Sequence, residues 1–151
     1  MEPAKAEWEL LGRTSLPGVR ESVSCARHQV RQWLGNGHPA VNDVVLATSE
    51  LVTNAVTHSG CGRDDFIGLV LARRDGLLRV EVNDPGALDF EPEVREDPEA
   101  ENGRGLLIIR ELAEEWGTRA HGPGVGRTVW CVIRFAPRLV TQVRHEATAA
   151  P

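Results

Sequence analysis

Hydrophobic and polar positions repeat with two different periods along the chain, and these periods predict its secondary structure. Apolar residues recur every three or four positions in residues 18–34 and again in residues 40–58, which predicts two amphipathic helices. Three shorter runs are typical of β-strands, at residues 7–16, 66–72 and 77–83. Asp75-Gly76 separates the last two of these runs and is a strong turn signal, so we expect the runs to form a β-hairpin.

The second half of the chain continues with a loop, a helix and two strands. Residues 84–102 lack any period, carry three prolines and are strongly acidic, which predicts a long surface loop. A third apolar stripe, closed by Trp116, predicts a helix over residues 103–116. Two further strands are expected, at residues 117–121 and 127–135. This order predicts an α+β fold, a two-layer α/β sandwich whose mixed, mainly antiparallel sheet is covered on one face by three helices.

Composition narrows the class of protein. The chain has 151 residues and is 41% hydrophobic, which suits one domain over residues 1–136 and a flexible tail over residues 137–151. A net charge of -5 argues against direct, sequence-independent binding of nucleic acid. The three cysteines form no C-x-x-C pair, which disfavours a disulfide framework or a zinc site. Without a signal pattern or an apolar run near ~20 residues, we expect a cytoplasmic protein that does not enter membranes.

Three polar residues lie at steps of four in the otherwise apolar helix of residues 40–58. They are Glu50, Asn54 and His58. Glu50 and Asn54 therefore point the same way, as a carboxylate that can polarise a hydroxyl and an amide oxygen that suits Mg²⁺. The alternative is a helix flank with two solvated polar side chains. His58 fits a helix C-terminus, where a histidine commonly caps carbonyl groups.

Further candidates lie at the ends of the later elements. Asp84 and Gly86 belong to the stretch NDPG, which is either a common turn or a carboxylate aimed at an exocyclic amine, with room for a ring beside the glycine. Gly103 and Gly105 at the start of a helix would expose N–H groups to an anion, or would serve only as a hinge.

Two of these later motifs add a charged or a hydroxyl side chain. Arg104 lies between the two glycines and adds a charge that could reach a phosphate. Thr128 in GRTVW could offer its hydroxyl to a ligand, or could simply begin a half-buried strand. Ile108 stands where a dinucleotide-binding fingerprint would have its third glycine, so that fold is disfavoured.

Four short motifs occur in a fixed order, and together they resemble the N, G1, G2 and terminal boxes of the GHKL ATPase superfamily. These motifs are ELVTNA (50–55), NDPG (83–86), ENGRGL (101–106) and GRTVW (126–130). The ELVTNAVTHS form and the pairing of GRGL with GRTVW look most like the bacterial anti-sigma-factor serine kinases. The resemblance covers roughly residues 15–135.

The resemblance implies a site for ATP and Mg²⁺. Glu50 would be the general base, Asn54 would bind Mg²⁺, and residues 87–102 would form a lid over ATP. Asp84 would accept a hydrogen bond from adenine N6, and Gly86 would allow the ring to come close. The remaining implied contacts are Gly103, Arg104 and Gly105 for the phosphates and Thr128 in support of the adenine end.

A protein of this family would hold a sigma factor away from RNA polymerase. It would also phosphorylate a serine on a small antagonist protein, which would release the antagonist. The alternative is an ATP-gated interaction module of the same fold that transfers no phosphate, and Glu50 is the residue on which the two hypotheses differ. The resemblance leaves a homodimer open.

Overall fold

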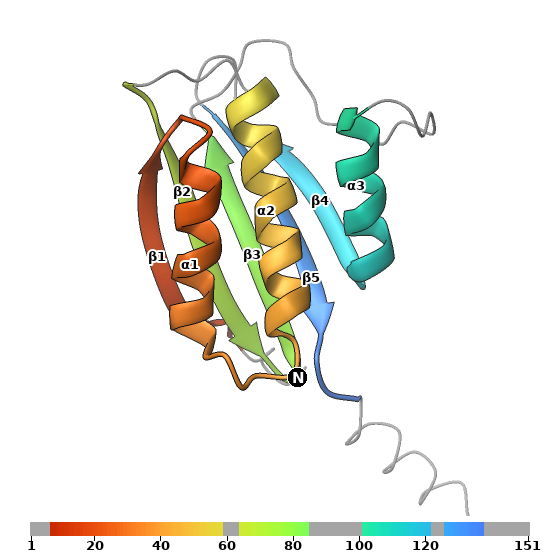
Figure 1. The fold of residues 1–151 in the computed structure, drawn as a ribbon. Coiled ribbons are helices and arrows are strands. Elements are labelled where there is room, and N and C mark those ends of the chain that lie inside the picture. The colour runs from red at the N-terminus through yellow and green to blue at the C-terminus, as the bar shows by residue number, and fades with distance from the viewer. Residues whose placement is uncertain (1–6, 59–63, 85–100, 122–125, 138–151) are drawn as a thin grey trace, which may run out of the picture.

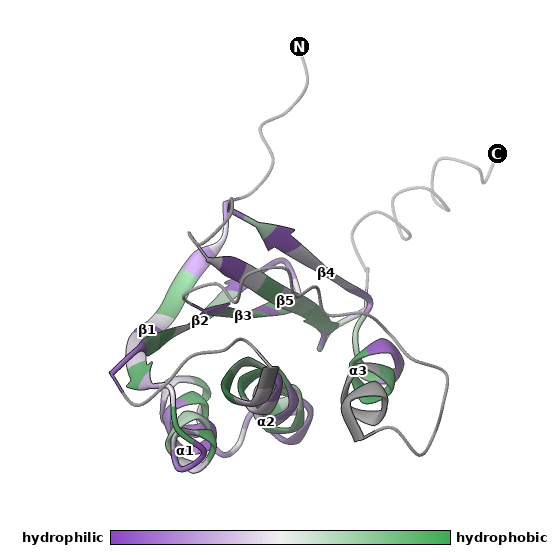
Figure 2. Cartoon of the chain, turned by 90° about the horizontal axis from the view of Figure 1, so that it is seen from above, coloured by the Kyte–Doolittle hydropathy of each residue, from purple (hydrophilic) through white to green (hydrophobic). Residues whose placement is uncertain are grey.

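The computed structural model describes residues 7–58, 64–84, 101–121 and 126–137, in which three helices cover one face of a five-stranded sheet (Figure 1). The elements are β1 (Glu9–Pro17), α1 (Ser22–Leu34), α2 (Val41–His58), β2 (Phe66–Arg74), β3 (Leu77–Asp84), α3 (Glu101–Leu112), β4 (Glu115–Ala120) and β5 (Arg127–Arg134). Seen from above, α2 lies between α1 and α3, and no helix of the described ranges covers the opposite face (Figure 2). The predicted two-layer α+β sandwich is confirmed.

The strands follow the order β1-β2-β3-β5-β4, and all four pairings between these described strands are antiparallel. The hairpin between β2 and β3 turns at Asp75 and Gly76, whose φ angles are 45° and 80°. Positive φ at both central residues is the requirement of a type I′ turn, which matches the twist of the two strands. The predicted hairpin is therefore confirmed. After α3 the chain first forms the edge strand β4, and β5 then lies between β4 and β3.

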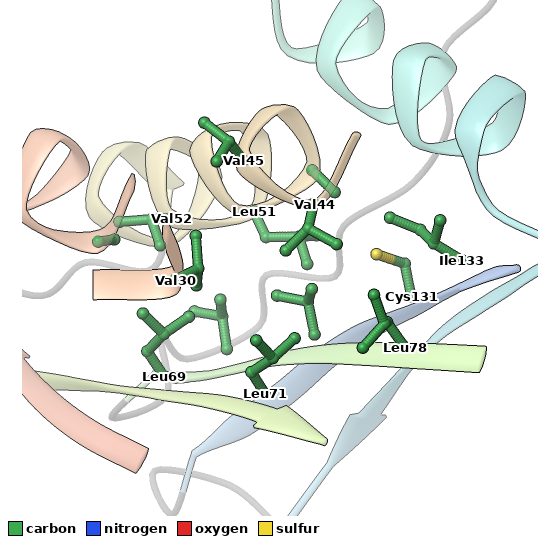
Figure 3. Packing of buried hydrophobic residues seen from close by; sticks show 14 of the residues in the cluster. Val30, Val44, Val45, Leu51, Val52, Leu69, Leu71, Leu78, Cys131 and Ile133 are labelled. Carbon is green, nitrogen blue, oxygen red and sulfur yellow. The ribbon is translucent and has the colours of Figure 1, made fainter. Parts of the chain in front are cut away.

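Alternate residues of each strand point toward the helices, and most of the residues on this face are aliphatic. Its central pairs join Leu78, Val80 and Val82 of β3 to Ile133, Cys131 and Val129 of β5. Figure 3 shows Leu51 and Val52 of α2 reaching this layer. Burial raises the pKa of the Cys131 thiol to about 12, so this side chain stays protonated and packs as a small apolar group.

The third helix differs from its predicted bounds. It runs from Glu101 to Leu112, whereas the stripe predicted 103–116, and Trp116 belongs to β4 instead. Trp116 pairs with Cys131 of β5 and packs against the core, so it is an inner residue, as its apolar character predicted, but on a strand. A long-range strand pairing decides this point, and the local period does not contain it.

Several predictions fall outside the described residues. These are Gly86, residues 138–151 of the predicted tail, residues 122–125 between the last two predicted strands and nearly all of the acidic loop. None of the helices in the described ranges combines the length and the apolar character that a bilayer crossing requires.

Candidate functional site

Four elements meet at one end of the molecule, where the candidate residues lie. The C-terminal half of α2, the end of β3, the beginning of β5 and the beginning of α3 all lie at the top of the molecule in Figure 1. Antiparallel pairing of β3 with β5 produces part of this arrangement, because the last residue of one strand then faces the first residue of the other. Residues far apart in the sequence thus share one end of the sheet.

The polar flank of α2 supplies Glu50 and Asn54. Both side chains are half-buried, while Leu51 between them is buried in the core. Ser49 lies on the other flank, where its hydroxyl accepts a weak hydrogen bond from Arg27 of α1 at 3.4 Å. Figure 2 shows α2 between α1 and α3. Because Ser49 is on the α1 side, helical spacing places Glu50 and Asn54 on the α3 side.

The half-buried setting changes the acidity of Glu50. Removal from water disfavours the charged form and raises the pKa of its carboxyl group above 4.5. A carboxylate with a raised pKa accepts a proton more readily, as a general base must. His58 is the last residue of α2, and its side chain lies outside the described part, so it receives no role here.

A charged pair of positions closes the β3–β5 ladder. Asp84 ends β3 and stands directly opposite Arg127, which begins β5. By strand alternation both lie on the helix-covered face, one step beyond the apolar pair of Val82 and Val129. Arg127 is only 9% exposed, and its Nη1 has no hydrogen-bond partner.

A buried guanidinium nitrogen without a hydrogen-bond partner destabilises the folded protein. Leaving a buried donor unsatisfied costs about 1–3 kcal/mol, and more when the group is charged. A native structure keeps such a group where an ion, a water or a ligand compensates it. The sequence motifs did not identify Arg127 as a candidate, although it stands beside Thr128 in GRTVW. The available signal was its position opposite Asp84, which requires knowledge of the strand register.

Thr128 lies on the other face of the sheet, opposite Asn83. Its hydroxyl donates to Oδ1 of Asn83, and Oγ1 of Thr128 also lies 2.7 Å from Nε2 of His121. Because the hydroxyl proton is used toward Asn83, Nε2 of His121 is the donor in the second hydrogen bond. Thr128 therefore holds the residue that precedes Asp84 from behind the sheet.

The glycines of the third motif lie in α3 and not before it. The helix begins at Glu101, so Gly103 and Arg104 belong to its first turn and Gly105 follows directly. The first four N–H groups of a helix have no partner inside the helix, and they attract negative charge. An anion at this end of α3 would lie at the same end of the sheet as the polar flank of α2.

A divalent metal at this end of the sheet would be bound by few protein ligands, together with water and phosphate oxygens. Within the described ranges, no group of three or more His, Cys, Asp or Glu side chains is placed to hold a metal ion. Mg²⁺ commonly uses only one or two protein ligands together with water and phosphate oxygens. The half-buried amide of Asn54 fits that kind of site better than a closed protein cage.

The comparisons with known proteins agree with this arrangement. A family model described as a histidine kinase-like ATPase domain matches residues 16–133. The chain belongs to the histidine kinase-like ATPase family. It is 33% identical over 125 residues to "Serine-protein kinase RsbW" of Listeria monocytogenes serotype 4a (strain HCC23), covering 75% of this chain and 73% of that protein. It is 28% identical over an alignment of 160 positions to the protein of the same name in Bacillus pumilus (strain SAFR-032), covering 97% of this chain and 88% of that protein.

A solved structure shows the same family fold. The histidine kinase domain from the Erythrobacter litoralis EL346 blue-light activated histidine kinase superposes with a TM-score of 0.52 at 20% sequence identity. The match covers 80% of this chain and 62% of that chain, so the chain spans less than two thirds of this structural relative. The resemblance to the GHKL superfamily is confirmed, and with it the expectation of a histidine kinase-like ATPase fold.

Proposed function

We propose that this family member binds Mg·ATP at the α2–α3 end of the sheet and transfers the terminal phosphoryl group to a protein serine. One observation carries the proposal: the C-terminal half of α2, the end of β3 at Asp84 and the first turn of α3 lie at the same end of the sheet. The similarity to proteins named serine-protein kinases supports a serine as the acceptor.

Each part of the site has a proposed task. Asp84 accepts a hydrogen bond from adenine N6, and Gly86 lets the ring approach. Thr128 supports this end by holding Asn83 beside Asp84. Asn54 offers its amide oxygen to Mg²⁺, which neutralises phosphate charge when bound. The phosphates meet the beginning of α3, with contacts from Gly103, Arg104 and Gly105.

Glu50 has the task of general base. Its carboxylate accepts the proton of the serine hydroxyl while the hydroxyl oxygen bonds to the terminal phosphorus. The bond from that phosphorus to the bridging oxygen breaks, and ADP is the leaving group. The raised pKa of Glu50 supports this assignment, because it improves proton acceptance near neutral pH.

The partners in the proposal follow from the family resemblance. The protein would act in the cytoplasm, where it would hold a sigma factor and phosphorylate a small antagonist of that complex. Copurification from the native cell, followed by mass spectrometry of bound proteins and of phosphoserine, identifies both partners.

The test compares phosphoryl transfer with ATP binding. The protein is incubated with Mg·ATP and the copurified antagonist, and phosphoserine is measured. Glu50→Ala is expected to keep ATP binding and to lose transfer by a factor of roughly 100 or more. Asp43→Ala, at an exposed acid in the first turn of the same helix, is the matched control and should transfer normally.

Two outcomes would change the proposal. Equal transfer by Glu50→Ala and the wild type would remove Glu50 from the role of base. A wild-type protein that binds ATP and a sigma factor but phosphorylates no antagonist would be the ATP-gated interaction module instead.

A further inference from the structure

Arg127 is a buried charged residue to which the proposed reaction gives no task. Its side chain is 9% exposed, and Nη1 has no hydrogen-bond partner. A guanidinium group keeps its charge at any physiological pH, so a change of protonation cannot relieve this donor. A bound molecule with an acceptor at this position would satisfy it.

The position of Arg127 indicates which part of a ligand it would meet. In the β3–β5 ladder it stands opposite Asp84, on the helix-covered face. Directly opposed side chains of an antiparallel pair are about 4.5–5.5 Å apart at Cβ. The pair therefore presents one acceptor and one donor side by side at the end of β3 and the start of β5, the end of the sheet where α2 ends and α3 begins (Figure 1).

We infer that Arg127 is a second base-reading residue, whose Nη1 donates to a ring nitrogen next to the 6-amino group of adenine. This inference rests on the proposed role of Asp84. The 6-amino group is a donor, and it lies between two acceptors, N1 and N7, so either edge offers the donor–acceptor pattern that Asp84 and Arg127 complement.

The pair would also exclude guanine. Guanine carries an oxygen at position 6, which places an acceptor against the carboxylate of Asp84. On its N1 edge guanine carries a hydrogen, which places a donor against the donor of Arg127. On its N7 edge the arginine contact would survive and the Asp84 contact alone would discriminate. The two edges are therefore separable with analogues that lack a single ring nitrogen.

The experiment measures binding of Mg·nucleotides to the full chain by calorimetry. The ligands are ATP, 1-deaza-ATP, 7-deaza-ATP and GTP. The proteins are the wild type, Arg127→Met and Arg119→Met, an exposed arginine of the neighbouring strand β4 that serves as the matched control. A hydrogen bond from a charged donor predicts that the wild type binds one of the two deaza analogues at least tenfold more weakly than ATP.

The Arg127→Met variant should lose the same hydrogen bond, and therefore the same factor in ATP affinity, by removing its donor. Arg127→Met is expected to bind ATP about tenfold more weakly, and to show no further loss with the analogue that the wild type disfavours. Arg119→Met should reproduce the wild-type series. The comparison of analogues on the wild type needs no substitution, so it decides the question even where Arg127→Met fails to fold.

Two results would overturn the inference. In one, the wild type binds ATP and both deaza analogues equally well. In the other, Arg127→Met loses the same factor for ATP and for both analogues, which would indicate a contact away from the base. Asp84→Asn separates this failure from that of the proposed function. If Asp84→Asn abolishes the preference for ATP over GTP while the deaza series is flat, only the role of Arg127 falls. If the wild type binds no nucleotide, both fall.

Discussion

The β3–β5 ladder has two ends with opposite chemistry on the same face of the sheet. At one end Leu78 pairs with Ile133, and both are buried among aliphatic side chains. At the other end Asp84, which is half-buried, pairs with Arg127, which is only 9% exposed. The two pairs share the same strands and the same register, so the contrast lies in their side chains.

This comparison indicates how the fold makes a site. The aliphatic pairs keep β3 and β5 in register, and the register then delivers a carboxylate and a guanidinium to each other at the ladder's end. The site is thus an extension of the core, and its geometry depends on packing several residues away. Stability should come mainly from the apolar end, while ligand recognition should come mainly from the charged end.

The largest expected effect is at the apolar end. Leu78→Ala removes a fully buried side chain and leaves a cavity, so the free energy of unfolding should fall by about 2–5 kcal/mol. Urea denaturation followed by circular dichroism measures it. Leu10→Ala, at a leucine of β1 that is 57% exposed, is the control and should cost less than about 1 kcal/mol. A small loss at Leu78 would show that the apolar end does not carry the stability.

An intermediate effect is expected behind the charged end. Thr128→Val keeps the shape of the side chain but removes both hydrogen bonds of its hydroxyl, to Asn83 and to His121. The free energy of unfolding should fall by about 1–2 kcal/mol, because Asn83 and His121 lose a partner. Thr118→Val, at an exposed threonine of β4, is the matched control.

A second measurement on the same variant separates support from contact. Thr128 holds Asn83 from the open face, so ATP affinity of folded Thr128→Val should change by less than about tenfold. A larger loss of affinity without loss of stability would mean that the threonine hydroxyl itself contacts the nucleotide.

The two ends also differ in how far the sequence could predict them. The helix α2 and the hairpin at Asp75 and Gly76 were predictable, because a repeat of apolar residues and a turn dipeptide are local signals. The prediction that Trp116 is helical was wrong, because its pairing with Cys131 is a contact between distant segments. A helical period cannot contain that information.

The motifs predicted which segments form the site, but they did not predict on which face of the sheet each side chain lies. The motifs predict that both Asp84 and Thr128 lie near adenine. Strand alternation puts Thr128 behind the sheet and its neighbour Arg127 in front, a difference of one residue in register. Only the paired strand shows which of the two shares a face with Asp84, so Arg127 could not be found from the motif alone.

A smaller effect on stability is expected at the charged end itself. Arg127→Met removes an unpaired buried donor and replaces it with an apolar chain of similar length. The free energy of unfolding without nucleotide should rise by about 1 kcal/mol, because the variant no longer buries a charged donor without a partner at Nη1. A loss above about 2 kcal/mol in urea denaturation would mean that Arg127 serves the core, and the contrast between the two ends would disappear.

The smallest effect concerns the pH dependence that Glu50 brings to the site. Burial raises the pKa of its carboxyl group above 4.5, so the folded protein binds this proton more tightly than the unfolded chain does. Stability from this group is therefore fully present below pH 4.5 and is lost as the pH rises through the higher folded pKa. Glu50→Gln, which is neutral at every pH, should be more stable than the wild type at pH 7 by about 0.5 kcal/mol or less.

The difference between the two proteins should shrink as the pH falls to 4, where the wild-type carboxyl group is mostly protonated in both states. Thermal unfolding at pH 4 and pH 7 measures it, and Asp43→Asn, at an exposed acid of the same helix, is the control. A wild type more stable than Glu50→Gln at pH 7 would mean that the ionised carboxylate is stabilised where it lies. The carboxylate of Glu50 would then accept a proton less readily than the proposed reaction requires.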